Sequence, residues 1–166
     1  ESIKIGDIKL IRPTQKCDAL ITEYDFGLSV FPADCQCVAI KDNRKSIKAL
    51  VHSGWRGTLK EVIPKTILEL LLRGSKIQDI QVVLGPMLLK QNFEIKDDYI
   101  NDFREYIKEL GAEKKIISYN IAKDCYNIDL LEIILKQLKN IGILEGNINL
   151  SSVEDTYSSV DEYGNI

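Results

Sequence analysis

The stretch that most constrains this chain runs from residue 32 to residue 57, PADCQCVAIKDNRKSIKALVHSGWRG. Two apolar runs flank the turn pair Asp42-Asn43, which predicts two neighbouring strands. A tight, glycine-bounded loop, GWRG, follows the second run. Cys35 and His52, the only histidine, stand at ends of these two runs. The fold can therefore bring a thiol and an imidazole together.

The rest of the chain carries further strand and helix patterns. Short apolar runs bounded by turn residues predict strands, and apolar residues at helical spacing closed by glycine predict helices. In the first helix Thr58 fits the N-cap position, and Pro64 predicts a kink or a later start. The expected strands are 7–12, 19–22, 27–31, 35–41, 47–52, 80–84, 115–119 and 147–151, and the expected helices are 58–73, 97–110 and 127–141. This order favours an α+β fold with a mixed sheet.

Composition places the chain among soluble globular proteins. Its 166 residues fit one domain, and 45% hydrophobic with 28% charged residues is ordinary. A net charge of −3 gives no reason to expect a nucleic-acid or membrane partner. No apolar run reaches the roughly 18 residues of a membrane span, and no signal peptide is visible. Four cysteines are too few for a disulfide scaffold, so we expect reduced thiols and a cytoplasmic location.

Cys35 and His52 leave three interpretations open. Thiolate and imidazole are zinc ligands, so the two residues could form part of a metal site. They could instead be a nucleophile and its base, or a buried thiol and a structural imidazole. Cys37 shares a strand face with Cys35, which allows either a chelate or a core thiol. The zinc-deaminase motif is absent, because no glutamate stands two residues after His52.

The loop from Gly54 to Gly57 is a candidate anion site. A guanidinium, Arg56, stands beside backbone amides at an expected helix start, a combination that binds phosphate or carboxylate. Trp55 could offer an aromatic wall to a substrate. The alternative is a structural turn with a packed tryptophan.

Six segments together resemble a known family. In order along the chain they are CDALIT (17–22), ADCQCVAI (33–40), VHSGWRG (51–57), LGPML (84–88), NFEI (92–95) and NIDLLEIILKQLKNIGI (127–143). The chain resembles the laccase-domain family, also called the multicopper polyphenol oxidoreductase or purine nucleoside phosphorylase family. The resemblance covers most of the chain, and the paired Ala-Asp-Cys and His-x-Gly-Trp-Arg-Gly motifs are specific.

The resemblance implies a single laccase-type domain over residues 1–166 without the N- and C-terminal family segments. The implied fold is a sandwich of mixed β-sheets flanked by helices, in α/β/β/α layers. The implied metal is zinc, held by Cys35 and His52 and by a third ligand from a Gln-x-His element that this sequence lacks and that would fall at or just before Glu1. A Cys-Thr element of the family is similar to Asp155-Thr156 here.

The implied activity is zinc-dependent purine nucleoside phosphorolysis, with adenosine deamination as an associated activity. The partners would be a purine nucleoside and phosphate. Cys35, His52 and Arg56 would be catalytic, and Arg56, Trp55 and Gly57 would contact phosphate or substrate. Copper is the older alternative metal, but one histidine cannot build the His-rich sites of a multicopper oxidase.

Two other functions stay open beside phosphorolysis. A cysteine–histidine hydrolase or deamidase would use Cys35 as its nucleophile. A peptidoglycan-editing or non-catalytic binding protein would use the same pocket without this chemistry.

Overall fold

The computed structural model describes residues 2–5, 8–11, 13, 15–111 and 116–157. The strands are β1 Ser2–Ile5, β2 Ile8–Ile11, β3 Ala19–Thr22, β4 Gln36–Asp42, β5 Lys48–Ser53, β6 Ile80–Leu84, β7 Glu94–Ile95, β8 Ile117–Asn120, β9 Cys125–Ile128 and β10 Ile148–Asn149. The α-helices are α1 Trp55–Leu59, α2 Val62–Leu72, α3 Asp97–Leu110 and α4 Leu130–Asn140. None of these described helices is long and apolar enough to cross a membrane.

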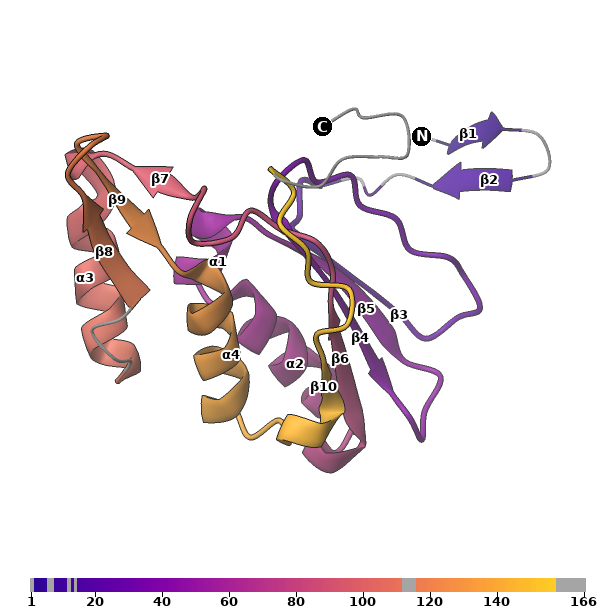
Figure 1. Cartoon of the computed structure of the whole chain (residues 1–166). Coiled ribbons are helices and arrows are strands. Elements are labelled where there is room, and N and C mark those ends of the chain that lie inside the picture. Colours follow the sequence, from indigo (N-terminus) through magenta and orange to yellow (C-terminus); the bar gives the residue numbers. More distant parts are fainter. Residues whose placement is uncertain (1, 6–7, 12, 14, 112–115, 158–166) are drawn as a thin grey trace.

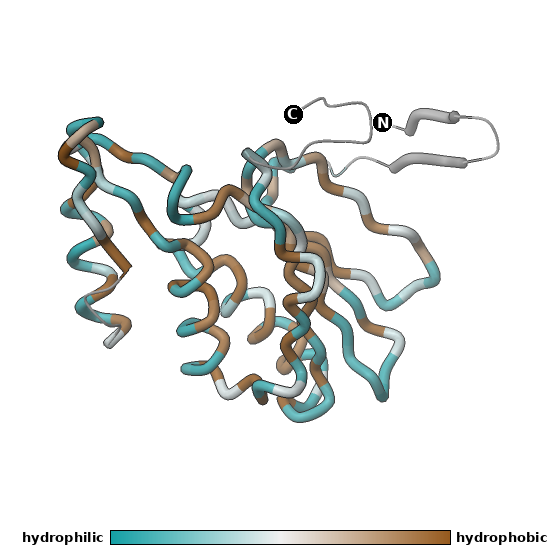
Figure 2. Tube along the Cα trace, in the orientation of Figure 1, coloured by the Kyte–Doolittle hydropathy of each residue, from teal (hydrophilic) through white to brown (hydrophobic). Residues whose placement is uncertain are grey.

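The main sheet has five strands in the order β10-β6-β4-β5-β3. Only the β10–β6 pair is parallel, so the sheet is mixed, and the expected α+β class is confirmed. Alternate residues of β4 and β5, such as Val38, Ile40 and Val51, are buried. They form a core with apolar residues of α2 and α4, and Figure 2 shows hydrophobic residues gathered along these elements.

A second, three-stranded antiparallel sheet has the order β7-β9-β8 and contacts α3. Its core is built around Phe103, Ile100 and Ile133, which are almost fully buried. Figure 1 shows α1, α2 and α4 between this sheet and the five-stranded one. The other face of the large sheet is open among the described residues, where Ala39 and Lys41 are exposed. The face-to-face sandwich of the two sheets therefore stays a prediction.

The expected first helix, 58–73, is two helices. Lys60 and Glu61 separate α1 from α2, and Glu61 adopts a left-handed backbone conformation with φ 59°. Pro64 is the third residue of α2, where a missing N–H breaks no helical hydrogen bond. Gly54, and not Thr58, stands at the N-cap position of α1. The interruption that Pro64 predicted thus lies three residues earlier.

Two other expectations differ from the structure. Residues 27–31 form no strand, because this segment has no ladder partner and Phe31 is 92% exposed. The expected helix 127–141 begins only at Leu130, because Asn127 belongs to β9 and the Asp129 carboxylate caps α4 by accepting from Glu132 N at 3.0 Å. The expected elements 19–22, 80–84 and 97–110 are confirmed with the same ends. The remaining expected strands are present with shifted ends, and residues 7, 12 and 115 of the expected ranges lie outside the described residues.

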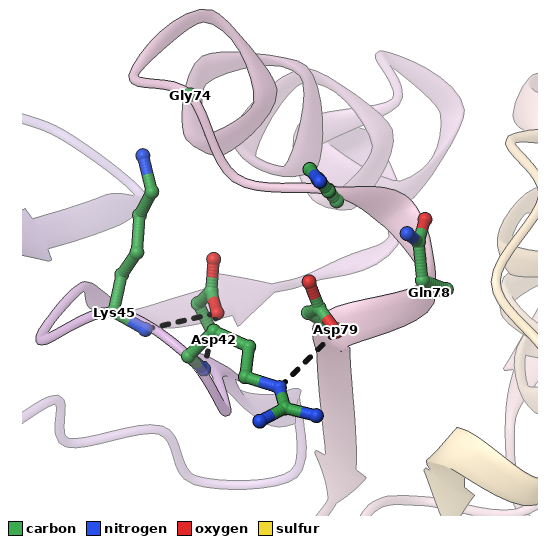
Figure 3. Close-up of a pocket in the computed structure, with 7 residues that line it drawn as sticks. Asp42, Lys45, Gly74, Gln78 and Asp79 are labelled. Carbon is green, nitrogen blue, oxygen red and sulfur yellow. Dashed lines mark hydrogen bonds and ion pairs between the residues drawn. The ribbon is translucent and has the colours of Figure 1, made fainter.

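The β4–β5 hairpin turn is held by Asp42, which is buried at the end of β4 (Figure 3). Its Oδ1 accepts from the backbone N of Arg44 at 2.7 Å and of Lys45 at 3.1 Å. Burial alone would raise the pKa of Asp42, but these two backbone hydrogen bonds and the charge of Lys45 help to lower it overall. A recess of about 410 Å³ opens here, at the end of β4 opposite Cys35.

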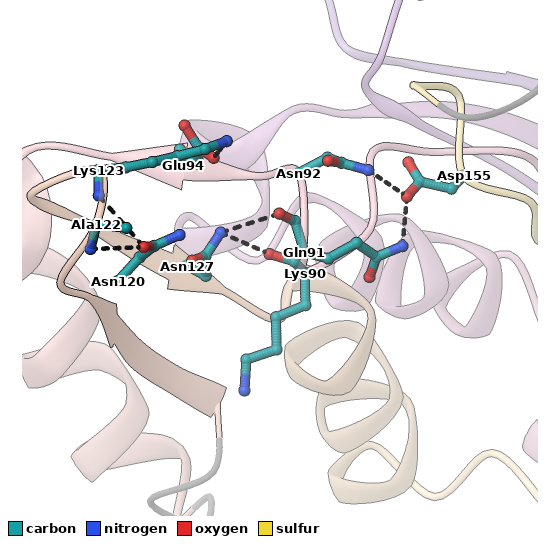
Figure 4. Close-up of polar contacts among 9 residues, drawn as sticks. All are labelled: Lys90, Gln91, Asn92, Glu94, Asn120, Ala122, Lys123, Asn127 and Asp155. Atoms are coloured by element: carbon teal, nitrogen blue, oxygen red, sulfur yellow. Dashed lines mark hydrogen bonds and ion pairs between the residues drawn. The ribbon is translucent and has the colours of Figure 1, made fainter.

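A buried carboxylate fastens the segment after β10 to the loop between β6 and β7 (Figure 4). Asp155 accepts from the side chains of Gln91 and Asn92 and from the backbone N of Leu89. Its neighbour Thr156 donates to Asp34 Oδ1 at 2.9 Å, directly before Cys35 in the sequence. These contacts of Asp155 and Thr156, which we call the latch, thus support the loop that carries Cys35 from a segment near the other end of the chain.

We expect Asp155→Ala to destabilise the fold by about 2 kcal/mol, because the buried carboxylate is the acceptor of several half-buried hydrogen bonds that this change removes. Burial raises the pKa of Asp155, but its hydrogen bonds outweigh burial and lower it from the ordinary 3.8. The stabilisation should therefore be fully present at neutral pH, begin to fall as the pH approaches 3.8, and be lost as the pH falls through the lower pKa of the folded state. Urea unfolding at pH 7 and at a series of pH values from about 4 downward measures both effects. The exposed Asp102→Ala is the control, and equal stability of the two variants at pH 7 would contradict the latch.

Candidate functional site

The hairpin register brings Cys35 and His52 together. Cys35 directly precedes β4, and His52 lies near the end of β5, where Gln36 pairs with Ser53. Gly54 follows, and a Cβ built on it would lie 3.2 Å from Cys35 Sγ and 3.7 Å from His52 Nε2. Thiol and imidazole therefore converge on the space that the missing side chain of Gly54 leaves open.

Asp18, which is not among the predicted site residues, orients His52. The Asp18 carboxylate lies 3.0 Å from His52 Nδ1, and the backbone N of His52 donates to Asp18 O at 2.7 Å. An ionised carboxylate only accepts hydrogen bonds, so Nδ1 carries a proton in this contact, and in the neutral ring Nε2 keeps its lone pair. The pairing of β3 with β5 places these residues opposite each other, one step beyond the Ala19–Val51 pair. A sequence-based pairing of the expected strands 19–22 and 47–52 could have found it.

The surroundings of Cys35 are electronegative. Burial raises the pKa of this thiol, and the charges of Asp34 and Asp18 raise it further. The Cys35 sulfur is therefore neutral near pH 7 unless a cation approaches. Cys37 lies opposite His52 in the register, and burial raises its pKa as well. Among the described residues, no three His, Cys, Asp or Glu side chains gather closely enough to hold a metal.

Trp55 and Arg56 pack against α3. The Trp55 ring lies 5.0 Å from Tyr99 and 5.7 Å from Phe103, so it joins the second core. The exposed Arg56 guanidinium stacks on Trp55 at 4.0 Å from the ring centre. Gly57 sits where a Cβ would meet Val62 at 3.4 Å. Of the predicted substrate contacts, Arg56 is exposed and presents its charge to solvent. Trp55 does not point to solvent in the same way, because its ring packs between the Arg56 guanidinium and α3.

A buried polar network fixes α1. Thr58 Oγ1 lies 2.9 Å from Ser53 Oγ and donates to Gly54 O at 3.1 Å. Gln137 on α4 donates to Thr58 O at 2.7 Å and to the Tyr106 hydroxyl at 2.6 Å. Burial, with the charge of Glu61 as a lesser cause, raises the pKa of Tyr106 to about 12, so this hydroxyl stays protonated. The GWRG loop is thereby held from β5 and α4 at once.

A recess of about 650 Å³ lies beside Asp18, between the edge strand β3 and the α1–α2 segment. Its lining combines apolar residues with charged ones of both signs. The lining residues are Cys17, Asp18, Ala19, Ile21, Arg56, Gly57, Lys60, Val62, Lys65, Thr66 and Glu69.

Comparison with known proteins defines the class. Residues 3–163 match the family model described as "Multi-copper polyphenol oxidoreductase laccase". The chain therefore belongs to this laccase-domain family. The solved "hypothetical protein YfiH" of Bacillus licheniformis is similar, with a TM-score of 0.66 and 27% identity over 82% of this chain and 51% of that one.

Curated relatives in this family carry enzyme names. A protein of Rickettsia conorii named purine nucleoside phosphorylase is 24% identical over 95% of this chain and 62% of its own length. One of that name from Clostridium acetobutylicum is 37% identical over 70% of this chain and 54% of its own length. A protein named adenosine deaminase RL5, from an unknown prokaryotic organism, is 30% identical over 53% of this chain and 34% of its own length. The matched part of the chain thus spans about half of the second relative, somewhat more of the first and about a third of the third.

The Asp18–His52 contact predicts the tautomer of the only histidine. In the unmodified chain we expect neutral His52 to carry its proton on Nδ1, because the Asp18 carboxylate accepts it. Asp18→Ala should shift the ring toward the Nε2–H form. ¹⁵N NMR of the single imidazole measures this directly, with Asp25→Ala as the control. An Nε2–H tautomer in the unmodified chain would contradict the contact.

The close approach of Cys35 Sγ to Gly54 predicts that a larger residue at position 54 destabilises the site. Its φ of −68° suits alanine, so Gly54→Ala acts through the added Cβ, which crowds Cys35 Sγ. We expect a loss of about 1–2 kcal/mol and shifted His52 ring signals. Gly27→Ala is the matched control, because nothing lies within 4 Å of its Cβ position. Chemical denaturation and NMR check both variants. Unchanged stability and unchanged His52 signals in Gly54→Ala would show that the space is not tight.

Proposed function

We propose that this protein is a zinc-dependent purine nucleoside phosphorylase that acts on a purine nucleoside and phosphate. The observation that carries the proposal is the convergence of Cys35 Sγ and His52 Nε2 on Gly54, with Asp18 behind the imidazole. Curated relatives with this enzyme name support the reaction class.

The donor set fits zinc chemically. A thiolate and an imidazole nitrogen are zinc ligands, and a carboxylate that accepts from the other ring nitrogen is the usual support of such a histidine. The charges of Asp34 and Asp18, which disfavour a free Cys35 thiolate, favour a cation in this space. Cys35 and His52 would hold the ion, with a third ligand from outside the described residues. The ion would supply Lewis acidity and a more acidic bound water.

The residues of this chain would divide the phosphorolysis step among them. In the reaction a phosphate oxygen bonds to C1′ of the ribose while the bond from C1′ to the purine nitrogen breaks. The bonding electrons leave with the base, which takes up a proton, and ribose 1-phosphate remains. Arg56 would bind and orient the phosphate, and the backbone near Gly57 would adjoin it. Trp55 would keep the Arg56 guanidinium in place.

The sandwich fold belongs to the same proposal. The open face of the five-stranded sheet carries Ala39 and Val83, both exposed and apolar. We infer that a second sheet covers this face in the α/β/β/α arrangement. Such a layer would also close the space in front of Cys35 and His52 against water.

Deamination of adenosine is a second candidate, favoured by the relative named adenosine deaminase. A cysteine hydrolase or deamidase is a third, because Asp18, His52 and Cys35 follow the order of an orienting acid, a base and a nucleophile. The raised pKa of Cys35 weighs against that third mechanism.

We expect Cys35→Ser to lower bound zinc at least tenfold and phosphate-dependent release of hypoxanthine from inosine at least a hundredfold. Cys125→Ala is the control, because that thiol is buried in β9 away from the site. Metal analysis and a coupled assay with and without phosphate measure both quantities. Phosphorolysis that survives metal removal would refute the zinc proposal. Phosphate-independent ammonia release from adenosine would instead identify a deaminase.

A further inference from the structure

The recess beside Asp18 has an uneven balance of charge. It is lined by two acidic residues, Asp18 and Glu69, and by three basic ones, Arg56, Lys60 and Lys65. Both acidic residues have cationic or N–H partners. Asp18 accepts from His52 Nδ1, and Glu69 pairs with Arg73 at 2.9 Å.

Among the described residues, no carboxylate neutralises the three basic residues of the recess. In the part of the chain that the structure describes, neither Arg56, Lys60 nor Lys65 forms an ion pair with a carboxylate. Arg56 stacks on the Trp55 ring, and Lys65 Nζ donates to the backbone O of Lys60 at 2.7 Å. These contacts place the charges without neutralising them, so the recess retains positive charge.

The break between α1 and α2 produces this separation of charge. Glu61 directly follows Lys60, and an acid at this position could pair with either lysine. Glu61 instead has a left-handed backbone conformation, and its carboxylate accepts a hydrogen bond from the Tyr106 hydroxyl on α3 at 3.2 Å. Glu61 is absent from the lining of the recess. The lysines therefore face the recess without their neighbouring acid.

We propose that Lys60 and Lys65, together with Arg56, bind the phosphate group of the phosphorolysis reaction in this recess. The inference rests on the proposed function and adds two lysines and a location to it. Lysine and arginine bind phosphate through charge-assisted hydrogen bonds. The apolar lining residues Ala19, Ile21 and Val62 offer a wall for the attached sugar. A volume of about 650 Å³ suits a ligand of nucleoside size.

The same phosphate chemistry comes from two sources, inorganic phosphate as co-substrate and ribose 1-phosphate as product. Both should bind to the recess through the phosphate group. Calorimetric titration of each ligand into the full chain, without nucleoside, therefore tests the site separately from catalysis.

We expect Lys60→Ala and Lys65→Ala each to weaken binding of both ligands about tenfold, and the double variant about a hundredfold. The KM for phosphate should rise by the same factors while the KM for inosine changes less than twofold. Lys139→Ala is the matched control, because it removes the same charge from an exposed position on α4. Lys60→Arg and Lys65→Arg should retain binding, and thermal melts exclude misfolding as a cause.

The outcomes separate this inference from the proposed function. Phosphorolysis with an unchanged KM for phosphate in both alanine variants would overturn the lysine site and leave the enzyme activity intact. Phosphate binding that depends on Lys60 and Lys65 in a chain without phosphorolysis would support the site and refute the activity. Binding weakened equally by Lys139→Ala would reduce the effect to net charge and overturn the proposal.

Discussion

The candidate site depends on the antiparallel register between β4 and β5. Pairing of Gln36 with Ser53 places Cys35 beyond the end of one strand and Gly54 beyond the end of the other. A shift of one residue between these strands would turn His52 to the face of the sheet opposite Cys35. The register is set by the buried residues Val38 and Val51, which face the helices and cannot exchange places with their exposed neighbours. The same core that stabilises the hairpin therefore positions the thiol and the imidazole.

Around this hairpin, long-range polar contacts hold the short helix α1 and the loop before β4. Gln137 fixes α1 from α4, 79 positions away along the chain from Thr58. Asp155 and Thr156 fix the loop before β4 from a segment after the last strand. The Gln137 contact is buried and the contact of Leu89 N with Asp155 is half-buried, so losing either leaves polar groups without partners. The contact of Thr156 with Asp34 is exposed and adds a link between segments that are distant in sequence.

Sequence reasoning recovered the strands of the hairpin, the helix of residues 97–110 and the α+β class, because apolar periodicity reports directly on burial. It placed Cys35 and His52 at the ends of neighbouring strands, where the structure brings them together. It did not find Asp18 or Gln137, because single polar residues carry no periodic signal and their partners are distant in sequence. It also joined α1 to α2, since nothing in the local pattern distinguishes a left-handed Glu61 from a helical one. The short strand β7 was missed because a two-residue pattern is too brief to recognise.

Trp55 is the only tryptophan of the chain, and its ring lies directly beneath the Arg56 guanidinium. When tryptophan is excited selectively over the seven tyrosines of the chain, the emission therefore originates at one edge of the candidate site. An anion that draws the guanidinium away from the indole changes the electric field on the ring, and the emission reports that change without any label. The stacking that positions the Arg56 charge thus also allows tryptophan fluorescence to report on the site in the native chain.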